Sequence, residues 1–263
     1  MLQELTVAGY TLSMYDMFDA LAGLTLLIYI LMKTKKYREY LFDTTSDPKG
    51  YTVLAFLQLL TLSLVFYRAL LLLNGIFADW FTQGNANYYG NLTAWLIVMT
   101  LFPIIFGVSP LKTMDLLSPG LPLCLSVAKI ACFFAGCCSG FEMPNSWYFN
   151  WDTGRHEFPV QLVEALVALA LYVFLCRYQK RSRIPGSVFP VYLVLYAVSR
   201  FATEFLRGDL PSVFGILNAY QILSVVYALL GGVLLGAVWA HHRGASRRTE
   251  ASAAACHSED GQS

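Results

Sequence analysis

Seven apolar runs of about span length set the fold class of this chain. A membrane-spanning helix needs about 20 mostly apolar residues. The chain has 263 residues, of which 57% are hydrophobic and 13% charged, against about 25% charged in an average soluble domain. The sequence therefore predicts an all-α integral membrane protein with seven transmembrane helices. We expect these spans at residues 14–32, 51–73, 91–107, 115–136, 159–176, 187–206 and 216–239.

The basic residues predict how these spans are oriented. Of the 18 lysines and arginines, 13 fall in segments that share one side of a seven-span topology. Such segments stay in the cytoplasm, so we expect the N-terminus outside and the C-terminus inside. The start, "MLQEL", lacks a basic region, which favours a retained first helix over a cleaved signal peptide. Residues 1–243 then form the transmembrane domain, and the small, polar residues 244–263 a disordered cytoplasmic tail.

Charged residues inside the predicted spans are the first functional signal. A charged side chain near the bilayer centre costs about 2.5–3.5 kcal/mol on insertion scales, and it usually faces a bundle interior or a wet cavity. Gln161 and Glu164 share one face of span five, near its predicted outer end. The five basic residues that do not serve orientation all fall in or beside the outer half of the membrane: Arg68, Lys129, Arg155, Arg200 and Arg207.

Span six carries a polar face. Arg200 and Glu204 are spaced i, i+4, with Tyr196 one turn earlier and Arg207 one turn later. In one interpretation, Arg200 and Glu204 neutralise each other and hold helices together. In the other, Lys129 and Arg200 lie at similar depth on different helices and bind an anion, which in the outer leaflet is naturally a phospholipid phosphate. We favour the anion site, because Glu204 alone does not account for two cations.

The six cysteines include no C-x-x-C pair and no cysteine–histidine cluster at zinc-finger spacing. We therefore expect no disulfide scaffold, no metal site and no cofactor. Cys137 and Cys138 are adjacent, and their Cα atoms, about 3.8 Å apart, are too close for an ordinary disulfide. In the run "AGCCSG" we expect close packing and a helix end at Gly140. A reactive thiol is the alternative.

Four segments of the chain resemble the prolipoprotein diacylglyceryl transferase family: "SMYDMF", "AKIACFFAGCCSG", "FPVQLVEA" and "PGSVFPVYLVLYAVSRFATEFLRGD". The last segment is the most specific, because the order Tyr196, Arg200, Glu204, Arg207 and Asp209 is characteristic of that family. The resemblance implies a multi-pass enzyme of the bacterial inner membrane. Such an enzyme moves the diacylglyceryl group of phosphatidylglycerol onto the lipobox cysteine thiol of a prolipoprotein signal peptide, releases glycerol phosphate and involves no nucleic acid.

The resemblance also implies site residues. Arg200, Glu204 and Tyr196 match catalytic positions. Lys129 stands where the family has arginine, so it keeps the charge and loses the planar two-pronged hydrogen bonding. A free thiol has a pKa of about 8.5, so the reaction needs help to form a thiolate and cations to stabilise the departing phosphate. The positions matched to substrate binding are Lys129, Tyr15, Gln161, Glu164, Arg207 and Gly140.

Some family features are missing. Span three lacks the histidine and paired glycines that the family carries, and Phe158–Pro159 replaces the usual His-Pro at span five. His156, in the loop before span five, is the one substitute for the base. An alternative is therefore a catalytically silent member that binds anionic phospholipid or a lipoprotein precursor. A small transporter is disfavoured, because the sequence contains no inverted repeat.

Overall fold

The computed structural model describes residues 110–207 except 139, 152 and 183, residues 217–260, and the short segments 4–7, 10–13, 21–26, 28–29 and 32–33. Four helical stretches in these residues are long and apolar enough to cross a membrane: Thr113–Ala135, Val160–Arg181, Val188–Leu206 and Tyr220–Gly244. They correspond to the last four predicted spans. Predicted span 14–32 is described only in part, as helix. Predicted spans 51–73 and 91–107 lie outside the described residues.

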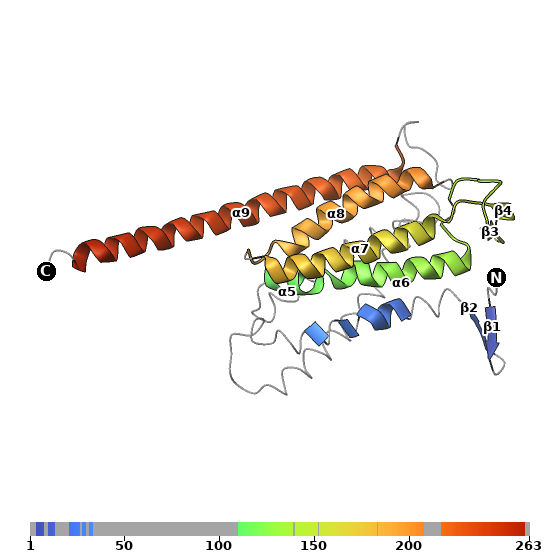
Figure 1. The fold of residues 1–263 in the computed structure, drawn as a ribbon, viewed down its shortest axis with the longest axis horizontal. Helices are drawn as coiled ribbons and strands as arrows, with labels where there is room; N and C mark the ends of the chain where they lie inside the picture. The colour runs from blue at the N-terminus through green and yellow to red at the C-terminus, as the bar shows by residue number, and fades with distance from the viewer. Residues whose placement is uncertain are drawn as a thin grey trace, which may run out of the picture.

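The helices pack in chain order. They are α5 (Pro110–Leu117), α6 (Gly120–Ala135), α7 (Val160–Arg181), α8 (Val188–Thr203) with the 3-10 turn η1 (Glu204–Leu206), and α9 (Ala219–Asp260). Helix α7 packs on α6, α8 on α7 and α9 on α8, with alternating direction (Figure 1). The ends of α6 and α8 therefore lie at the same end of the bundle as the starts of α7 and α9. We call this the loop end, because it carries the 140–158 segment.

Two short hairpins accompany the helices, which the expectation of an all-α fold did not include. Strands β1 (Glu4–Val7) and β2 (Tyr10–Ser13) pair antiparallel, with Glu4 opposite Ser13. Strands β3 (Phe149–Asn150) and β4 (Arg155–His156) pair within the 140–158 segment that joins α6 to α7. Neither hairpin lies in a candidate membrane span.

Helix α9 continues past its candidate span to Asp260, through a stretch for which the polar composition predicts disorder. Figure 1 shows this part of α9 extending beyond the other helices. The sequence there, "ASRRTEASAAA", is rich in alanine. Alanine has the highest helix propensity of all residues, which accounts for a helix where polarity alone predicts disorder.

A buried carboxylate anchors the start of α8. Asp115 on α5 is only 6% exposed. Its Oδ2 accepts a hydrogen bond from Gly186 N (2.6 Å), and its Oδ1 accepts from Val188 N (2.9 Å) and Phe189 N (3.0 Å). These N–H groups lie just before and within the first turn of α8, where a helix has no internal acceptors for them. Asp115 thus joins α5 to α8 at the end of the bundle opposite the loop end.

Replacing this anchor is expected to weaken the fold. Asp115→Ala should lower the free energy of unfolding by about 3 kcal/mol or more, because it leaves three N–H groups without their acceptor, at about 1–3 kcal/mol each. Asp115→Asn keeps one acceptor oxygen and should lose less. Thermal or urea unfolding of the purified protein in detergent measures both variants. An Asp115→Ala protein that unfolds like the unaltered chain would contradict the anchoring role.

Candidate functional site: a buried charge network

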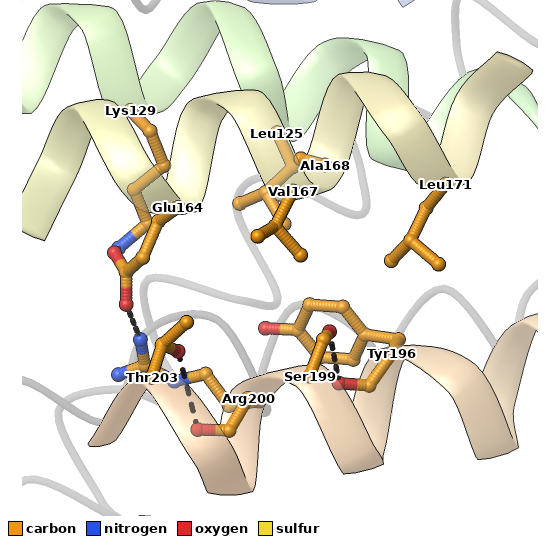
Figure 2. A pocket seen from close by; sticks show the side chains of 10 residues that line it. All are labelled: Leu125, Lys129, Glu164, Val167, Ala168, Leu171, Tyr196, Ser199, Arg200 and Thr203. Atoms are coloured by element: carbon orange, nitrogen blue, oxygen red, sulfur yellow. Dashed lines mark hydrogen bonds and ion pairs between the residues drawn. The ribbon is translucent and has the colours of Figure 1, made fainter. Parts of the chain in front are cut away.

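Three helices bring charged side chains together near the loop end. Lys129 lies in the last two turns of α6, Glu164 in the second turn of α7, and Arg200 in the last turn of α8. Because α7 runs antiparallel to both neighbours, these positions lie at similar depth in the bundle. Figure 2 shows the three side chains converging from separate helices.

The carboxylate of Glu164 bridges two cations. Its Oε2 lies 2.6 Å from Lys129 Nζ, and its Oε1 accepts a hydrogen bond from Arg200 Nη1. Arg200 Nη2 in turn lies 2.8 Å from Glu204 Oε2. Glu204 Oε1 lies 3.7 Å from Arg207 Nε. These side chains form a continuous chain of ion pairs, which we call the charge network: Lys129, Glu164, Arg200, Glu204 and Arg207.

The charge network is buried and carries a net positive charge. Side-chain exposure is 8% for Arg200, 4% for Arg207 and 0% for Glu204. Three cations and two carboxylates give this described network a formal charge of +1. Buried charges are costly unless they are paired. A net positive cluster in a low-dielectric interior therefore favours an anion beside it.

The anion site predicted from the sequence treats Glu204 as the one carboxylate partner, whereas in the structure Glu164 pairs with both Lys129 and Arg200. Mutual neutralisation therefore accounts for more of the charge than we expected. The anion interpretation now depends on the excess positive charge and on the pocket beside the network.

That pocket lies between α6, α7 and α8 and encloses about 290 Å³, including open solvent at its mouth. Figure 2 shows the charged groups at one end and Val167 and Leu171 toward the other. Since α7 runs inward from the loop end, the apolar part lies deeper in the bundle. The lining residues are Leu125, Lys129, Glu164, Val167, Ala168, Leu171, Tyr196, Ser199, Arg200 and Thr203. A ligand with a charged head and an apolar body fits this polarity.

Other predicted residues lie next to the network. Tyr196 is 4% exposed and lines the pocket one turn before Arg200. Gln161 is fully buried, and its Nε2 donates to Cys137 O at 2.8 Å. Its Oε1 has no hydrogen-bond partner among the residues that the structure describes. Tyr15 and Asp209 lie outside those residues.

Two further residues contact the network, one just before α9 and one in its first turn, and neither was predicted from the sequence. Asn218 Nδ2 donates to Glu204 Oε1 at 3.1 Å. The Tyr220 ring lies under the Arg200 guanidinium, with 5.4 Å between Cζ and the ring centroid, a distance at which a cation–π interaction is favourable. The signal that could have found them is the polar start, "NAYQ", of an otherwise apolar span.

Gly140 fixes the 140–158 segment against the network through the backbone. It forms an antiparallel bridge with Arg207, and Phe141 N donates to Leu206 O at 3.1 Å. A Cβ atom at Gly140 would overlap the carbonyl oxygen of Phe158. Glycine is therefore required here because two backbone segments approach too closely for any side chain.

A methyl group at this glycine should be costly. We expect Gly140→Ala to destabilise the protein by about 1–3 kcal/mol, the usual range for overpacking. Gly232→Ala is the matched control, because a Cβ there meets no atom within 4 Å of it, and alanine is the better helix former. Thermal unfolding in detergent compares the two variants. Equal melting temperatures would contradict the steric role of Gly140.

The cysteine run differs from the prediction. Helix α6 ends at Ala135 and is capped by Gly136 in the left-handed conformation (φ 77°), so the expected helix end at Gly140 is wrong. A glycine at this position avoids the steric penalty of a Cβ. The turn brings Cys137 and Cys138 back toward Cys132, and the three Sγ atoms lie within 4.8 Å of one another. Linear spacing did not reveal this cluster.

The thiol cluster also interacts with the network. The pKa of the Cys138 thiol lies below its usual value, chiefly because the Cys132 and Cys137 thiols hydrogen-bond to it. The charges of Lys129 and Arg207 lower it further, whereas burial opposes the shift. The cations thus act on the sulfur atoms as well as on the carboxylates.

His156 lies apart from these groups. It is exposed on β4, its ring packs edge-on against Phe149, and its Nδ1 lies 2.8 Å from Ser146 O. The charge network, as far as the structure describes it, contains no histidine. His156 is therefore a poor substitute for the base that the family motif would supply.

The comparisons with known proteins agree with the motifs. The family model described as prolipoprotein diacylglyceryl transferase matches residues 3–237. A relative from Clostridium perfringens, named phosphatidylglycerol–prolipoprotein diacylglyceryl transferase 2, is 34% identical over 131 residues, which are 48% of this chain and 51% of the relative. A relative from Methylococcus capsulatus, named phosphatidylglycerol–prolipoprotein diacylglyceryl transferase, is 34% identical over 176 residues, which are 63% of this chain and 65% of the relative. A relative with the same name from Pseudomonas aeruginosa (strain LESB58) is 30% identical over 183 residues, which are 65% of this chain and 66% of the relative.

This chain therefore spans about half to two thirds of the length of these relatives. The family model, by contrast, covers most of the chain. The resemblance predicted from the four motifs is confirmed. The chain belongs to the prolipoprotein diacylglyceryl transferase family.

Proposed function

We propose that this protein transfers the diacylglyceryl group of phosphatidylglycerol to the lipobox cysteine thiol of prolipoproteins. The observation that carries the proposal is the net positive charge network at the polar end of a pocket whose other end is apolar. The names of the relatives support the same reaction. We place it in a seven-span protein of the bacterial inner membrane, oriented N-out and C-in, with the loop end facing outward.

In this proposal the charged end of the pocket binds the lipid headgroup, and the apolar end contacts the lipid's acyl part. Lys129, Arg200 and Arg207 attract the phosphodiester, and Glu164 and Glu204 keep those cations oriented through the ion pairs described above. The glycerol backbone then lies beside the network, and the first carbons of the acyl chains contact the apolar end of the pocket.

The chemical step is a displacement at carbon. The cysteine sulfur forms a bond to the diacylglyceryl carbon, while the C–O bond to phosphate breaks and its electron pair leaves with glycerol phosphate. Preorganised cations in a water-poor site stabilise the charge that develops on the departing oxygen. In this proposal Tyr196, which lines the pocket, donates a hydrogen bond to the phosphate.

A reconstitution experiment tests the proposal. The purified full chain is placed in vesicles that contain phosphatidylglycerol and is given a peptide with a lipobox cysteine. We expect the peptide to gain the mass of a diacylglyceryl group. A peptide with serine in place of cysteine, and vesicles of phosphatidylethanolamine alone, serve as controls. Growth of a cell depleted of its own transferase, when this chain is supplied, is the independent readout.

The silent alternative is supported by one observation, the lack of a histidine in the described charge network. In that case the protein would bind phosphatidylglycerol vesicles or the peptide and yield no lipidated product. Binding without product over many hours would therefore overturn the transfer proposal and select the alternative.

A further inference from the structure

A cluster of three thiols lies beside the charge network, and the reaction as proposed so far does not use it. Cys132 lies in the last turn of α6, and Cys137 and Cys138 follow the Gly136 cap. The three Sγ atoms lie within 4.8 Å of one another, and all three side chains are partly buried. All three cysteines are free, so none is in a disulfide.

The backbone takes an unusual path to bring these thiols together. Gly136 and Cys138 both have positive φ values, 77° and 61°. For a residue with a Cβ, the left-handed conformation is sterically unfavourable. Such residues concentrate at functional sites, where the surrounding structure holds them in place.

The geometry of the cluster suits a zinc ion. Zinc binds cysteine sulfur at about 2.3 Å, so the sulfurs of a tetrahedral site are about 3.8 Å apart. Sulfur atoms already within 4.8 Å of one another need to move by only about 1 Å to reach this arrangement. Soft thiolate ligands also favour zinc over hard cations such as magnesium or calcium.

The cluster also lies beside cations. Lys129 interacts electrostatically with all three thiols, and Arg207 interacts with Cys138. The negative charge of a tri-thiolate zinc site would therefore face positively charged neighbours.

We propose that Cys132, Cys137 and Cys138 bind one Zn²⁺ ion as thiolates and leave its fourth position for the lipobox thiol. No fourth cysteine, histidine or carboxylate joins the cluster among the residues that the structure describes. Zinc sites with three protein ligands keep their fourth position open for substrate. This inference rests on the proposed transfer function and supplies the thiol activation for which the described network has no histidine.

The step balances without a basic side chain. A thiol that binds zinc loses its proton, which here passes to solvent. The bound sulfur is then a thiolate, and its electron pair forms the bond to the diacylglyceryl carbon. The C–O bond breaks at the same time, and its electron pair leaves with the phosphate. The zinc ion changes neither its charge nor its oxidation state.

Metal binding can be tested without any lipid transfer. The full chain in detergent is reduced, stripped with a chelator and titrated with Co²⁺ as a spectroscopic probe for the zinc site. We expect one equivalent to bind, with a sulfur-to-cobalt charge-transfer band and intense tetrahedral visible bands. Cys137→Ser should weaken binding by about 100-fold or more, because even outer-shell partners of metal ligands are worth about 10–100-fold. The controls Cys176→Ser and Cys256→Ser should bind like the unaltered chain.

Binding of the lipobox thiol at the fourth coordination position of the metal can be measured separately. A lipobox peptide with cysteine should shift the cobalt spectrum and increase the charge-transfer absorption, whereas the serine peptide should leave it unchanged. No metal binding above that of Cys137→Ser, or loss of free thiols from the cluster as a disulfide forms, would overturn the inference. So would a spectrum that does not respond to the cysteine peptide.

The two proposals can fail separately. Lipid transfer that is equally fast after metal stripping and in Cys137→Ser would overturn the zinc site and leave the transfer function intact. A protein that binds Co²⁺ and the peptide thiol but forms no lipidated product with phosphatidylglycerol would overturn the transfer function and leave the metal site intact.

Discussion

Replacing Arg200 by alanine is expected to lower the rate of lipid transfer by about 10³-fold or more, the upper range for removing one preorganised donor from a charged transition state. Arg200 is the central member of the charge network, because its two terminal nitrogens contact Glu164 and Glu204 separately. It also lines the pocket. The alanine variant therefore loses a cation beside the phosphate and leaves two buried carboxylates without their shared partner. The measurement is the rate of peptide lipidation in phosphatidylglycerol vesicles.

A conservative variant separates chemistry from folding. Arg200→Lys keeps the charge, but a single ammonium cannot reproduce the planar fork that reaches both carboxylates. We expect a partial loss of about 10–100-fold, with a melting temperature between those of the unaltered protein and Arg200→Ala. Rates are compared per amount of monodisperse protein after size-exclusion chromatography. An Arg200→Ala protein that retains the unaltered rate would remove the arginine from the reaction.

Removing the carboxylate of Glu164 should have a large effect on stability. Glu164 is buried and is the shared partner of Lys129 and Arg200. Breaking a buried ion pair from one side costs about 3–5 kcal/mol. The exposed pair of Arg155 and Glu142, 3.4 Å apart with 65% and 60% of their side chains exposed, is the matched comparison. Glu142→Ala should cost at most about 1 kcal/mol. Thermal unfolding in the same detergent measures both variants.

A second substitution tests whether uncompensated charge is the cause. Adding Lys129→Met to Glu164→Ala restores the original net charge of the network and should recover part of the lost stability, because apolar replacement of a buried pair is often tolerated. Lipid transfer should remain impaired in the double variant. If Glu164→Ala and Glu142→Ala melt alike, the network is not a stabilising unit.

The sequence predicts these helices well because the information is local. A run of apolar residues and its length are enough to place a span, and the last four predicted spans correspond to candidate spans in the structure. Helical spacing also placed Arg200, Glu204 and Arg207 on one face, as their ion pairs require. The bridging role of Glu164 was not predictable in the same way. It depends on the second turn of α7 facing both α6 and α8, which no single helix reveals.

Two further features were not predicted from the sequence: the thiol cluster, and the hydrogen bonds of Asp115 to the start of α8. Cys132 and Cys138 meet because the chain reverses at Gly136, and spacing rules for metal sites do not include that turn. The first glycine after an apolar helical run is a recognised stop signal, so Gly136 could have been preferred over Gly140. A lone carboxylate at the start of span four, Asp115, was also a signal, but its partners lie about 70 residues later in the chain.

The sharing of Glu164 between two cations has a consequence for turnover. A phosphate that enters the pocket finds Lys129 and Arg200 already engaged, so it must compete with a tethered anion for the same nitrogens. In the reaction we propose, the carboxylate would take back those contacts once glycerol phosphate has separated from the lipid, which would speed product release. The shared pairing thereby limits how tightly the headgroup is bound before and after transfer.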